Sequence, residues 1–543
     1  MGMASSTDGV PSSFAAGGAD SYTNPTPRGR RSSDEEAASS APPEHTTLTR
    51  RELLLGGGLA AACAAPISAQ PAARSVVVAT VSSGYQEGLE QLAREYEALV
   101  PGVRVKIQIM PVNGYETWLR TQIPAGGANA PDLFNANYAW GLYERGLMVN
   151  LSPYLAAHNP HTGLPWIRTL NAQFLERFKT GGDVSFIPLD FIEIGFYYNA
   201  DLFLRMGLRE PKTWEEMLAT AARIQQAGII PFAVPGNADS YWSGTVGWIA
   251  RFFSDAYTRP WVPLVMARPG DWNYDAKRNG HFHLDLKDPY NDAYVVLNTE
   301  RILAAVRDRV IGVNNGRFAE AYTRIRQFAR YWQRGFDGAS SQTAYNLFLT
   351  GRAAILLETS ALISQLLRDM ADLPARYRFR WSIFPVPPMT MSAYHIPPFR
   401  GVGGPGTVFG VVKKDPAQVR LVVDFLMFLT TPRAARILVD QAYRHHKPLN
   451  GPMLIPGAKL PEELAHYFRP FQNRGFEKLS FRGLLDEQQS IWEWTVWAQR
   501  YMEDLISLPE FLRRYERTLL QAVPRIIAMQ HLDMNPRTKD LQP

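Results

Sequence analysis

Aromatic and polar side chains recur in this chain directly after segments that have the pattern of β-strands. Aromatic rings pack on the apolar faces of sugars, and carboxylates, amides and hydroxyls hydrogen-bond to the hydroxyl groups of such ligands. Loops at the carboxyl ends of parallel strands are the usual place for such residues. The candidates are Tyr85, Asn137, Tyr138, Trp140, Asp190, Glu193, Tyr241, Trp242, Trp248, Glu358 and Thr359. Two of them have structural alternatives: Trp248 as a core residue and Asp190 as a capping or hinge group.

Three of these candidates carry carboxylates, which raises the alternative of an enzyme. A glycosidase needs two carboxyl groups about 5 to 9.5 Å apart, and Asp190, Glu193 and Glu358 could supply them. Nothing in their spacing requires this chemistry. The sequence has no Gly-x-Ser-x-Gly elbow with partners, no phosphate-binding loop and no His-Glu-x-x-His motif. We therefore expect binding without turnover, and an exported glycosidase-like enzyme is the alternative.

The composition narrows the class of protein further. The chain has 543 residues, of which 46% are apolar and 20% charged, enough for several packed units. The formal net charge is +6, but the basic residues are scattered along the chain, so nucleic acid is not an expected partner. Cys63 is the single cysteine, which excludes an internal disulfide and a cysteine-rich zinc site. No cofactor or metal is expected.

The N-terminal 69 residues have the features of an export leader. Residues 1–48 are rich in small and polar residues and are predicted to be disordered. At 49–69, Arg50-Arg51 precedes a short apolar run that resembles a twin-arginine signal peptide, so a periplasmic protein is expected. Cleavage after Ala69 would release a soluble protein, whereas cleavage before Cys63 would leave a lipid anchor. We favour soluble release, and the second possibility stays open.

Hydrophobic periodicity predicts an α/β protein. Strand patterns at 75–81, 103–109 and from 132 alternate with helix patterns at 89–99 and 115–123, which is typical of a parallel sheet. Thr213 and Glu216 form a capping-box pattern that predicts a helix start at Trp214. The Pro-, Gly- and aromatic-rich stretch 255–294 is expected to be a long loop or a lid-like insertion. The tail beyond residue 487 is expected to be mainly helical.

Several segments, in order, resemble extracellular solute-binding protein family 1, the sugar-binding class related to maltose-binding protein. They span about residues 75–450. They include Pro131-Asp132-Leu133-Phe134, Ile187-Pro188-Leu189-Asp190, Tyr197-Tyr198-Asn199-Ala200-Asp201, Pro211-Lys212-Thr213-Trp214, Gly351-Arg352-Ala353-Ala354 and Thr430-Thr431-Pro432-Arg433. The stretch 255–294 and the C-terminal helices depart from the family pattern.

This resemblance implies a two-lobed periplasmic-binding-protein fold of type II, with a ligand cleft between the lobes and hinge crossings near 190–194 and 399–403. The first lobe would comprise 74–190 and 402–440, and the second 191–401 and 441–543. The implied function is that of the substrate-binding protein of an ABC importer. It would capture a carbohydrate or related polyol and deliver it to the transmembrane permease subunits. Delivery to a membrane sensor in place of a permease is an open alternative.

Overall fold

The computed structural model describes residues 74–535 apart from 112–113, 128–129, 139–141, 144, 178, 181–182, 472–474, 476, 480, 482–484 and 486. The predicted leader at 1–48, the signal segment at 49–69 with Cys63, and Trp140 lie outside the described residues. None of the described helices has both the length and the apolar character needed to cross a bilayer.

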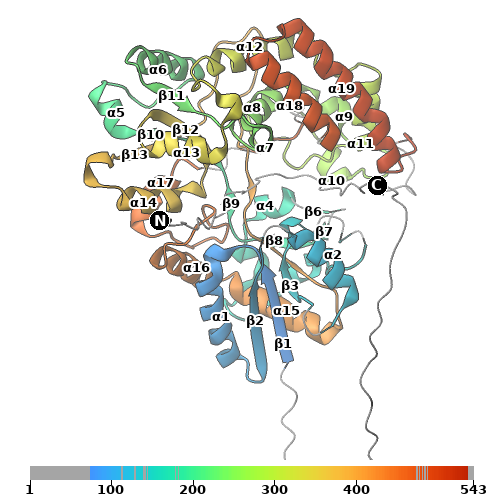
Figure 1. Cartoon of the computed structure of the whole chain (residues 1–543). Coiled ribbons are helices and arrows are strands. Elements are labelled where there is room, and N and C mark those ends of the chain that lie inside the picture. Colours follow the sequence, from blue (N-terminus) through green and yellow to red (C-terminus); the bar gives the residue numbers. More distant parts are fainter. Residues whose placement is uncertain are drawn as a thin grey trace, which may run out of the picture. The chain divides into compact units, whose positions relative to one another are not determined.

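The first lobe is built on a five-stranded sheet (Figure 1). Its strand order is β2 (Val103–Ile109), β1 (Arg74–Thr80), β3 (Leu133–Asn135), β15 (Val408–Val411), β8 (Phe186–Pro188). The central run 76–78 is at most 3% exposed, because the sheet is covered on both faces. β1 pairs in parallel with β2 and β3, as predicted, but β15 runs antiparallel to β3 and β8. The parallel pattern is broken because β15 enters this sheet from the second lobe.

The longer helices of the first lobe include the two predicted at 89–99 and 115–123. They are α1 (Gln86–Leu99), α2 (Tyr115–Ala125), α15 (Pro416–Leu429) and α16 (Pro432–Arg444). Asp132 links three parts of the lobe, because its carboxylate accepts hydrogen bonds from the Val77 backbone N–H (2.7 Å), Lys414 Nζ (2.7 Å) and Gln418 Nε2 (3.0 Å). The Pro-Asp pair therefore joins β1 to the segment that leads into α15.

The second lobe contains a four-stranded sheet of order β11 (Ile230–Ala233), β12 (Ala353–Thr359), β10 (Ile194–Asn199), β13 (Trp381–Pro385). β10 is antiparallel to both of its neighbours, whereas β11 and β12 are parallel. Helices of this lobe include α5 (Ala200–Arg205), α6 (Trp214–Gln226), α8 (Thr245–Thr258), α12 (Gly316–Ala329) and α13 (Ser341–Leu349).

The predicted capping pattern at the start of α6 is present in a modified form. Thr213 Oγ1 accepts a hydrogen bond from the Glu216 N–H at 3.1 Å, as in a capping box. The Glu216 carboxylate accepts from the N–H of Lys212 at 2.7 Å, one residue before the cap. The side chains still satisfy two backbone donors near the helix start.

The chain passes between the two sheets along three segments. It leaves the first sheet after Pro188, forms β9 (Phe191–Ile192) and enters the second sheet at Ile194. It returns from β13 through β14 (Gly404–Pro405) to β15. β9 and β14 pair with each other in an antiparallel two-stranded ribbon, which we call the crossing ribbon. A third passage follows α16 and leads to α17 (Glu462–Phe468), where the Tyr467 ring stacks on Trp381 with centroids 4.1 Å apart.

The stretch expected to be a loop or lid is partly helical. α8 continues to Thr258, and η4 (Arg259–Trp261), α9 (Val262–Val265) and α10 (Ala276–Asn279) follow. A β-bridge between Met266 and Leu297 joins the two ends of the remaining insertion. The buried Asn279 connects the two ends of this insertion, because its side-chain amide donates hydrogen bonds to the carbonyls of Ala267 (2.9 Å) and Val296 (2.8 Å).

The C-terminal helices α18 (Gln488–Met502) and α19 (Leu508–Met529) pack against each other, and α19 packs on α11 (Thr299–Arg307) and α12 (Figure 1). Trp494 is fully buried and donates a hydrogen bond from Nε1 to Tyr322 Oη at 2.8 Å. These helices share one hydrophobic core with the second sheet.

The remaining elements are short or peripheral. They are η1 (Ser83–Tyr85), η2 (Ala136–Tyr138), α3 (Ser152–Leu155), β4 (His158–Asn159), β5 (Leu164–Pro165), η3 (Trp166–Thr169), α4 (Ala172–Arg177), β6 (Lys179–Thr180), β7 (Asp183–Val184), α7 (Ala238–Tyr241), η5 (Phe336–Gly338), α14 (Leu362–Asp372) and η6 (Ala375–Tyr377).

Because α19 contributes to that shared core, truncating its buried face should destabilise the second lobe. Leu519 is fully buried, so Leu519→Ala should lower the free energy of unfolding by about 2–5 kcal/mol. Leu505 is 66% exposed, so Leu505→Ala is the matched control and should change it by less than about 0.5 kcal/mol. Chemical denaturation followed by tryptophan fluorescence measures both. Equal, small effects would show that α19 is not part of the core.

Candidate functional site

The three segments that pass between the sheets meet at the side chain of Asp190. This fully buried carboxylate lies between β8 and β9. It accepts hydrogen bonds from the Tyr85 hydroxyl, from the Thr407 N–H (2.6 Å) and Oγ1 (3.4 Å), and from Asn450 Nδ2 (3.2 Å). We call Tyr85, Asp190, Thr407 and Asn450 the Asp190 node. It joins the turn after β1 to all three passages.

The electrostatics of the node follow from its burial. Burial raises the pKa of Asp190 to about 6, although the hydrogen bonds from Tyr85, Thr407 and Asn450 oppose this increase. The pKa of the Tyr85 hydroxyl lies well above its usual value because of burial and the neighbouring carboxylate. Tyr85 is therefore a hydrogen-bond donor, and Asp190 acts as an acceptor that organises the surrounding chain.

On the side of the second lobe, Ser360 links the node to β10 and β12. Its Oγ donates to the Asn450 carbonyl at 2.5 Å, and its N–H donates to the Glu193 carbonyl at 2.8 Å. Two predicted site residues, Glu358 and Thr359, directly precede it. Burial raises the pKa of Glu358 to about 7, although its carboxylate accepts from the Thr359 N–H at 2.7 Å. Glu193, Glu358 and Thr359 thus lie at neighbouring ends of β10 and β12.

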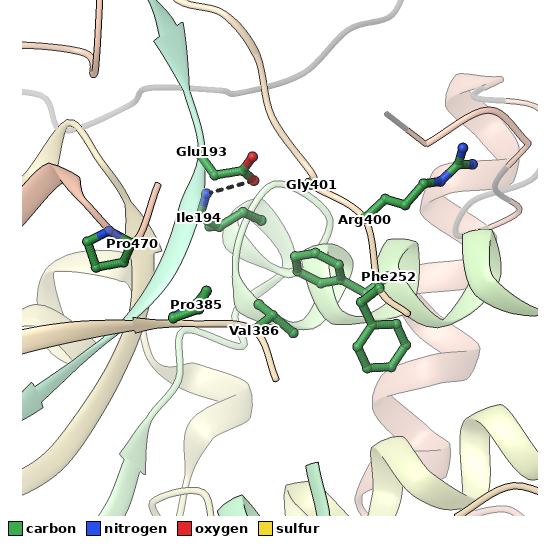
Figure 2. A pocket seen from close by; sticks show the side chains of 9 residues that line it. Glu193, Ile194, Phe252, Pro385, Val386, Arg400, Gly401 and Pro470 are labelled. Atoms are coloured by element: carbon green, nitrogen blue, oxygen red, sulfur yellow. Dashed lines mark hydrogen bonds between the residues drawn. The ribbon is translucent and has the colours of Figure 1, made fainter. Parts of the chain in front are cut away.

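A small pocket, partly open to solvent, adjoins this region (Figure 2). Most of its lining is apolar, and Glu193 and Arg400 supply the charged groups. The lining residues are Glu193, Ile194, Phe252, Pro385, Val386, Phe399, Arg400, Gly401 and Pro470. Figure 2 shows the Glu193 carboxylate beside Gly401, held by the Ile194 N–H at 3.3 Å, while the Arg400 side chain extends away from it.

The structure brings several predicted site residues together. Tyr85 and Asp190 contact each other directly. Asn137 is attached to the same region, because its Nδ2 donates a hydrogen bond to the Gly406 carbonyl at 2.5 Å. Gly406 directly precedes Thr407 of the Asp190 node. Tyr138 ends η2 close by in sequence. The loop after β3 and the turn after β1 therefore reach the same part of the first lobe.

Three predicted aromatic residues lie elsewhere. Tyr241 is fully buried, Trp248 is 3% exposed, and Trp242 is partly buried beside them. Tyr241 and Trp242 pack on Trp494, with ring centroids 5.8 and 5.7 Å away. These residues belong to the hydrophobic core that the second lobe shares with α18, because Tyr241 ends α7 and Trp248 lies in α8 with its side chain buried.

Sequence reasoning missed Thr407, Asn450, Ser360 and Arg400. Thr407 follows the sequence Gly-Val-Gly-Gly-Pro-Gly, and Asn450 precedes Gly451. Both positions have the composition of irregular segments where side chains often bind backbone or ligand groups. That signal could have identified the segments, but not the carboxylate on which they converge.

Two α/β lobes, the strand order of the first sheet and the paired crossings define a solute-binding protein of type II. Residues 81–436 match the family of bacterial extracellular solute-binding proteins, and the chain belongs to this family. The proteins of this family are extracellular, which implies that this protein is exported.

Several known proteins are similar to this chain. The multiple sugar-binding protein of Streptococcus mutans is 26% identical over 160 residues, which are 30% of this chain and 34% of that protein. This chain thus spans about a third of the length of that relative. The apo-form structure of RafE from Streptococcus pneumoniae superposes with a TM-score of 0.58 at 15% identity, covering 83% of this chain and 98% of RafE. A cyclic α-maltosyl-1,6-maltose binding protein from Arthrobacter globiformis gives a TM-score of 0.52 at 14% identity, covering 83% and 99%. The structural likeness establishes the fold.

The raised pKa of Asp190 predicts a pH-dependent stability. The folded protein holds the Asp190 proton more tightly than the unfolded chain, where the pKa is near 3.8. The resulting stabilisation is full below about pH 4 and is lost as the pH rises through 6. Two pKa units correspond to at most about 3 kcal/mol. Guanidinium denaturation at several pH values should therefore show wild type losing stability relative to Asp190→Asn between pH 4 and 7.

Tyr85→Phe provides a second check on this assignment. The variant removes a hydrogen bond that lowers the pKa of Asp190, so the loss of stability should move to higher pH. If wild type and Asp190→Asn keep a constant difference across this pH range, Asp190 does not titrate there.

Proposed function

We propose that this protein is the substrate-binding protein of an ABC importer, acting in the periplasm. It captures a carbohydrate or related polyol in a cleft between its two lobes and delivers it to the transmembrane permease subunits. The observation that carries this proposal is the convergence of three crossing segments at the Asp190 node. Two lobes that are joined through such segments can move relative to each other around a bound ligand.

The proteins that this chain resembles support a sugar-like ligand. One is named a multiple sugar-binding protein, and the structures of two others are of RafE in complex with raffinose and of a chitin oligosaccharide binding protein. The site chemistry agrees with such a ligand. Glu193, Glu358 and Thr359 provide hydrogen-bond acceptors and a hydroxyl group, and Glu193 lines the pocket together with apolar side chains such as Ile194 and Phe252.

Within this proposal the ligand contacts come from both lobes. Asn137 would supply the face of the first lobe, and Glu193 with Glu358 and Thr359 that of the second. Asp190 and Tyr85 position the crossing segments, because each uses its polar atoms on the other and on neighbouring protein groups. Tyr241, Trp242 and Trp248 are left out of this set because they pack in the core of the second lobe.

The geometry of Asp190 favours binding without turnover over a glycosidase. A general acid must reach the leaving oxygen of its substrate, and Asp190 is fully buried with its oxygens already bonded to Tyr85, Thr407 and Asn450. Glu193 and Glu358 remain as the only pair among the three carboxylates that the sequence nominated. A direct assay separates the two functions.

Titration calorimetry with raffinose, chito-oligosaccharides and malto-oligosaccharides should show saturable binding of at least one sugar. Chromatography of the same mixtures should recover the sugar intact after prolonged incubation. Glu358→Gln keeps the shape of the side chain but changes its hydrogen bonding, and it should weaken binding about 10-fold or more. Leu505→Ala, on the exposed surface, should bind as wild type does. Sustained release of shorter sugars would establish the enzyme instead.

Export through the twin-arginine route is the second part of the proposal. Replacing Arg50 and Arg51 with Lys should abolish appearance of the protein in the periplasmic fraction, because the paired guanidinium groups are the signal. Fractionation and immunoblotting measure the effect, and Arg74→Lys, beyond the signal, is the control. Cys63→Ser tests the lipid anchor. If the leader is cleaved after Ala69, as proposed, residue 63 is absent from the exported protein, so wild type and variant should have the same mass. Unchanged export of the double-Lys variant would contradict this route.

A further inference from the structure

One carboxyl group far from the Asp190 node is buried without a hydrogen bond. Glu300 lies in the first turn of α11 and is 1% exposed. Neither of its carboxylate oxygens has a partner at hydrogen-bonding geometry among the residues that the structure describes. An ionised carboxylate buried in this way is costly, so the group requires either a proton or a change in its surroundings.

Polar groups that face Glu300 belong to the short segment after α19, residues 530–535. Figure 1 shows the end of α19 beside α11, and these two helices pack against each other. Leu532 is 7% exposed and packs in the core of the second lobe, while the side chain of Asp533 and the N–H of Met534 face the Glu300 carboxyl. The segment lies beyond Met529, the last residue of α19, so it can separate from α11 without loss of helix.

The backbone of this segment is strained. His531 and Met534 have φ angles of 53° and 61°, in the left-handed region that residues other than glycine rarely adopt. The Leu532 N–H donates to the Ile527 carbonyl at 3.0 Å, and the Asn535 N–H donates to Asp533 Oδ1 at 2.8 Å. Because the backbone conformation is unfavourable, the position of the segment depends on its contacts with the rest of the lobe.

The charged groups that face Glu300 are both acidic: Asp533 and, from the insertion, Asp271. Asp271 is already paired, because Arg301 binds its two oxygens at 2.6 and 2.7 Å. Of the helices that pack on α11, α9 has no titratable side chain. The charged residues of α19 are bound elsewhere or exposed: Glu510 by Arg514, Glu516 by the Val313 N–H, Arg525 by Glu487, and Arg513 and Arg517 in solvent.

A proton can neutralise the two facing carboxyl groups, because it lets one of them donate to the other. Within the described ranges, no group of three or more His, Cys, Asp or Glu side chains is placed to hold a metal ion. Burial raises the pKa of Glu300 to about 7, with a further contribution from Asp533, whereas the Met534 N–H lowers it. The surroundings of Glu300 therefore favour its protonated form.

We propose that Glu300 and Asp533 form a proton-dependent latch, which holds the segment 530–535 on α11 while Glu300 is protonated and releases it when Glu300 ionises. The latch does not require that a sugar binds. Because the protein is exported, the segment would respond to the pH outside the cytoplasm.

The direction of the response follows from the two states of Glu300. The seated segment holds the Glu300 proton more tightly than the released one, in which the pKa returns towards 4.5. The stabilisation of the seated state is full below about pH 4.5 and is lost as the pH rises through about 7. The difference between these pKa values limits the change in the seating equilibrium to about 300-fold.

A nitroxide label on Asn535→Cys, at an exposed position, reports release in the full chain carrying Cys63→Ser. In electron paramagnetic resonance spectra, the ratio of mobile to immobile label should rise at least tenfold from pH 5 to pH 8. Glu300→Gln keeps the shape of the side chain without a titratable group, so its ratio should change less than twofold. Asp533→Asn removes the facing charge, so its ratio should rise less than that of the parent chain.

His531 is the other residue of the segment whose charge can change over this range, and it has its own control. Asparagine tolerates a positive φ, so His531→Asn keeps the backbone conformation and removes the imidazole. The transition should persist in this variant. It should also persist in Glu463→Gln, which removes an exposed carboxyl group on α17.

Three results would overturn the latch. They are a mobile fraction that does not change with pH in the parent chain, a transition that persists in Glu300→Gln, and one that disappears in His531→Asn. Asp533 is exposed, so Asp533→Asn provides the test even if Glu300→Gln does not fold. A rise in Asp533→Asn equal to that of the parent chain would likewise contradict the proposal.

Discussion

A single buried carboxylate organises the connection between the two lobes. Asp190 is fully buried among uncharged donors, and it is satisfied by groups from the turn after β1, from the second crossing and from the third passage. An unsatisfied carboxylate in this position would be costly, so the donors must stay in place whenever the group is ionised. The position of the crossings relative to the first sheet depends on this condition.

The second crossing is attached to the second lobe by charged side chains, whereas uncharged donors surround Asp190 on the side of the first lobe. In the second lobe the crossing is fixed by an arginine that shares two buried aspartates with a second arginine, and the charges nearly compensate one another. Breaking such a cluster leaves an uncompensated buried charge, which makes its geometry highly specific. The insertion supplies Asp292, so this addition to the family fold is joined to the second crossing through Arg400.

The attachments of the crossings to the two lobes lie close together along the chain. Each crossing is held by polar groups on both sides, and one residue in each lies between them. This arrangement keeps Glu193, which borders the pocket, at the point where the lobes meet.

The sequence by itself determined the local elements and the family. Periodicity identified β1 and α1, the capping pattern identified the start of α6, and ordered motifs indicated two lobes with crossings near Asp190 and Phe399. These features depend on neighbours in the chain. Only the tertiary structure decided that Trp248 packs in the core, that β15 runs antiparallel, and that Thr407 and Asn450 meet Asp190. Those contacts join residues that are far apart in sequence, and their geometry depends on how separate elements pack.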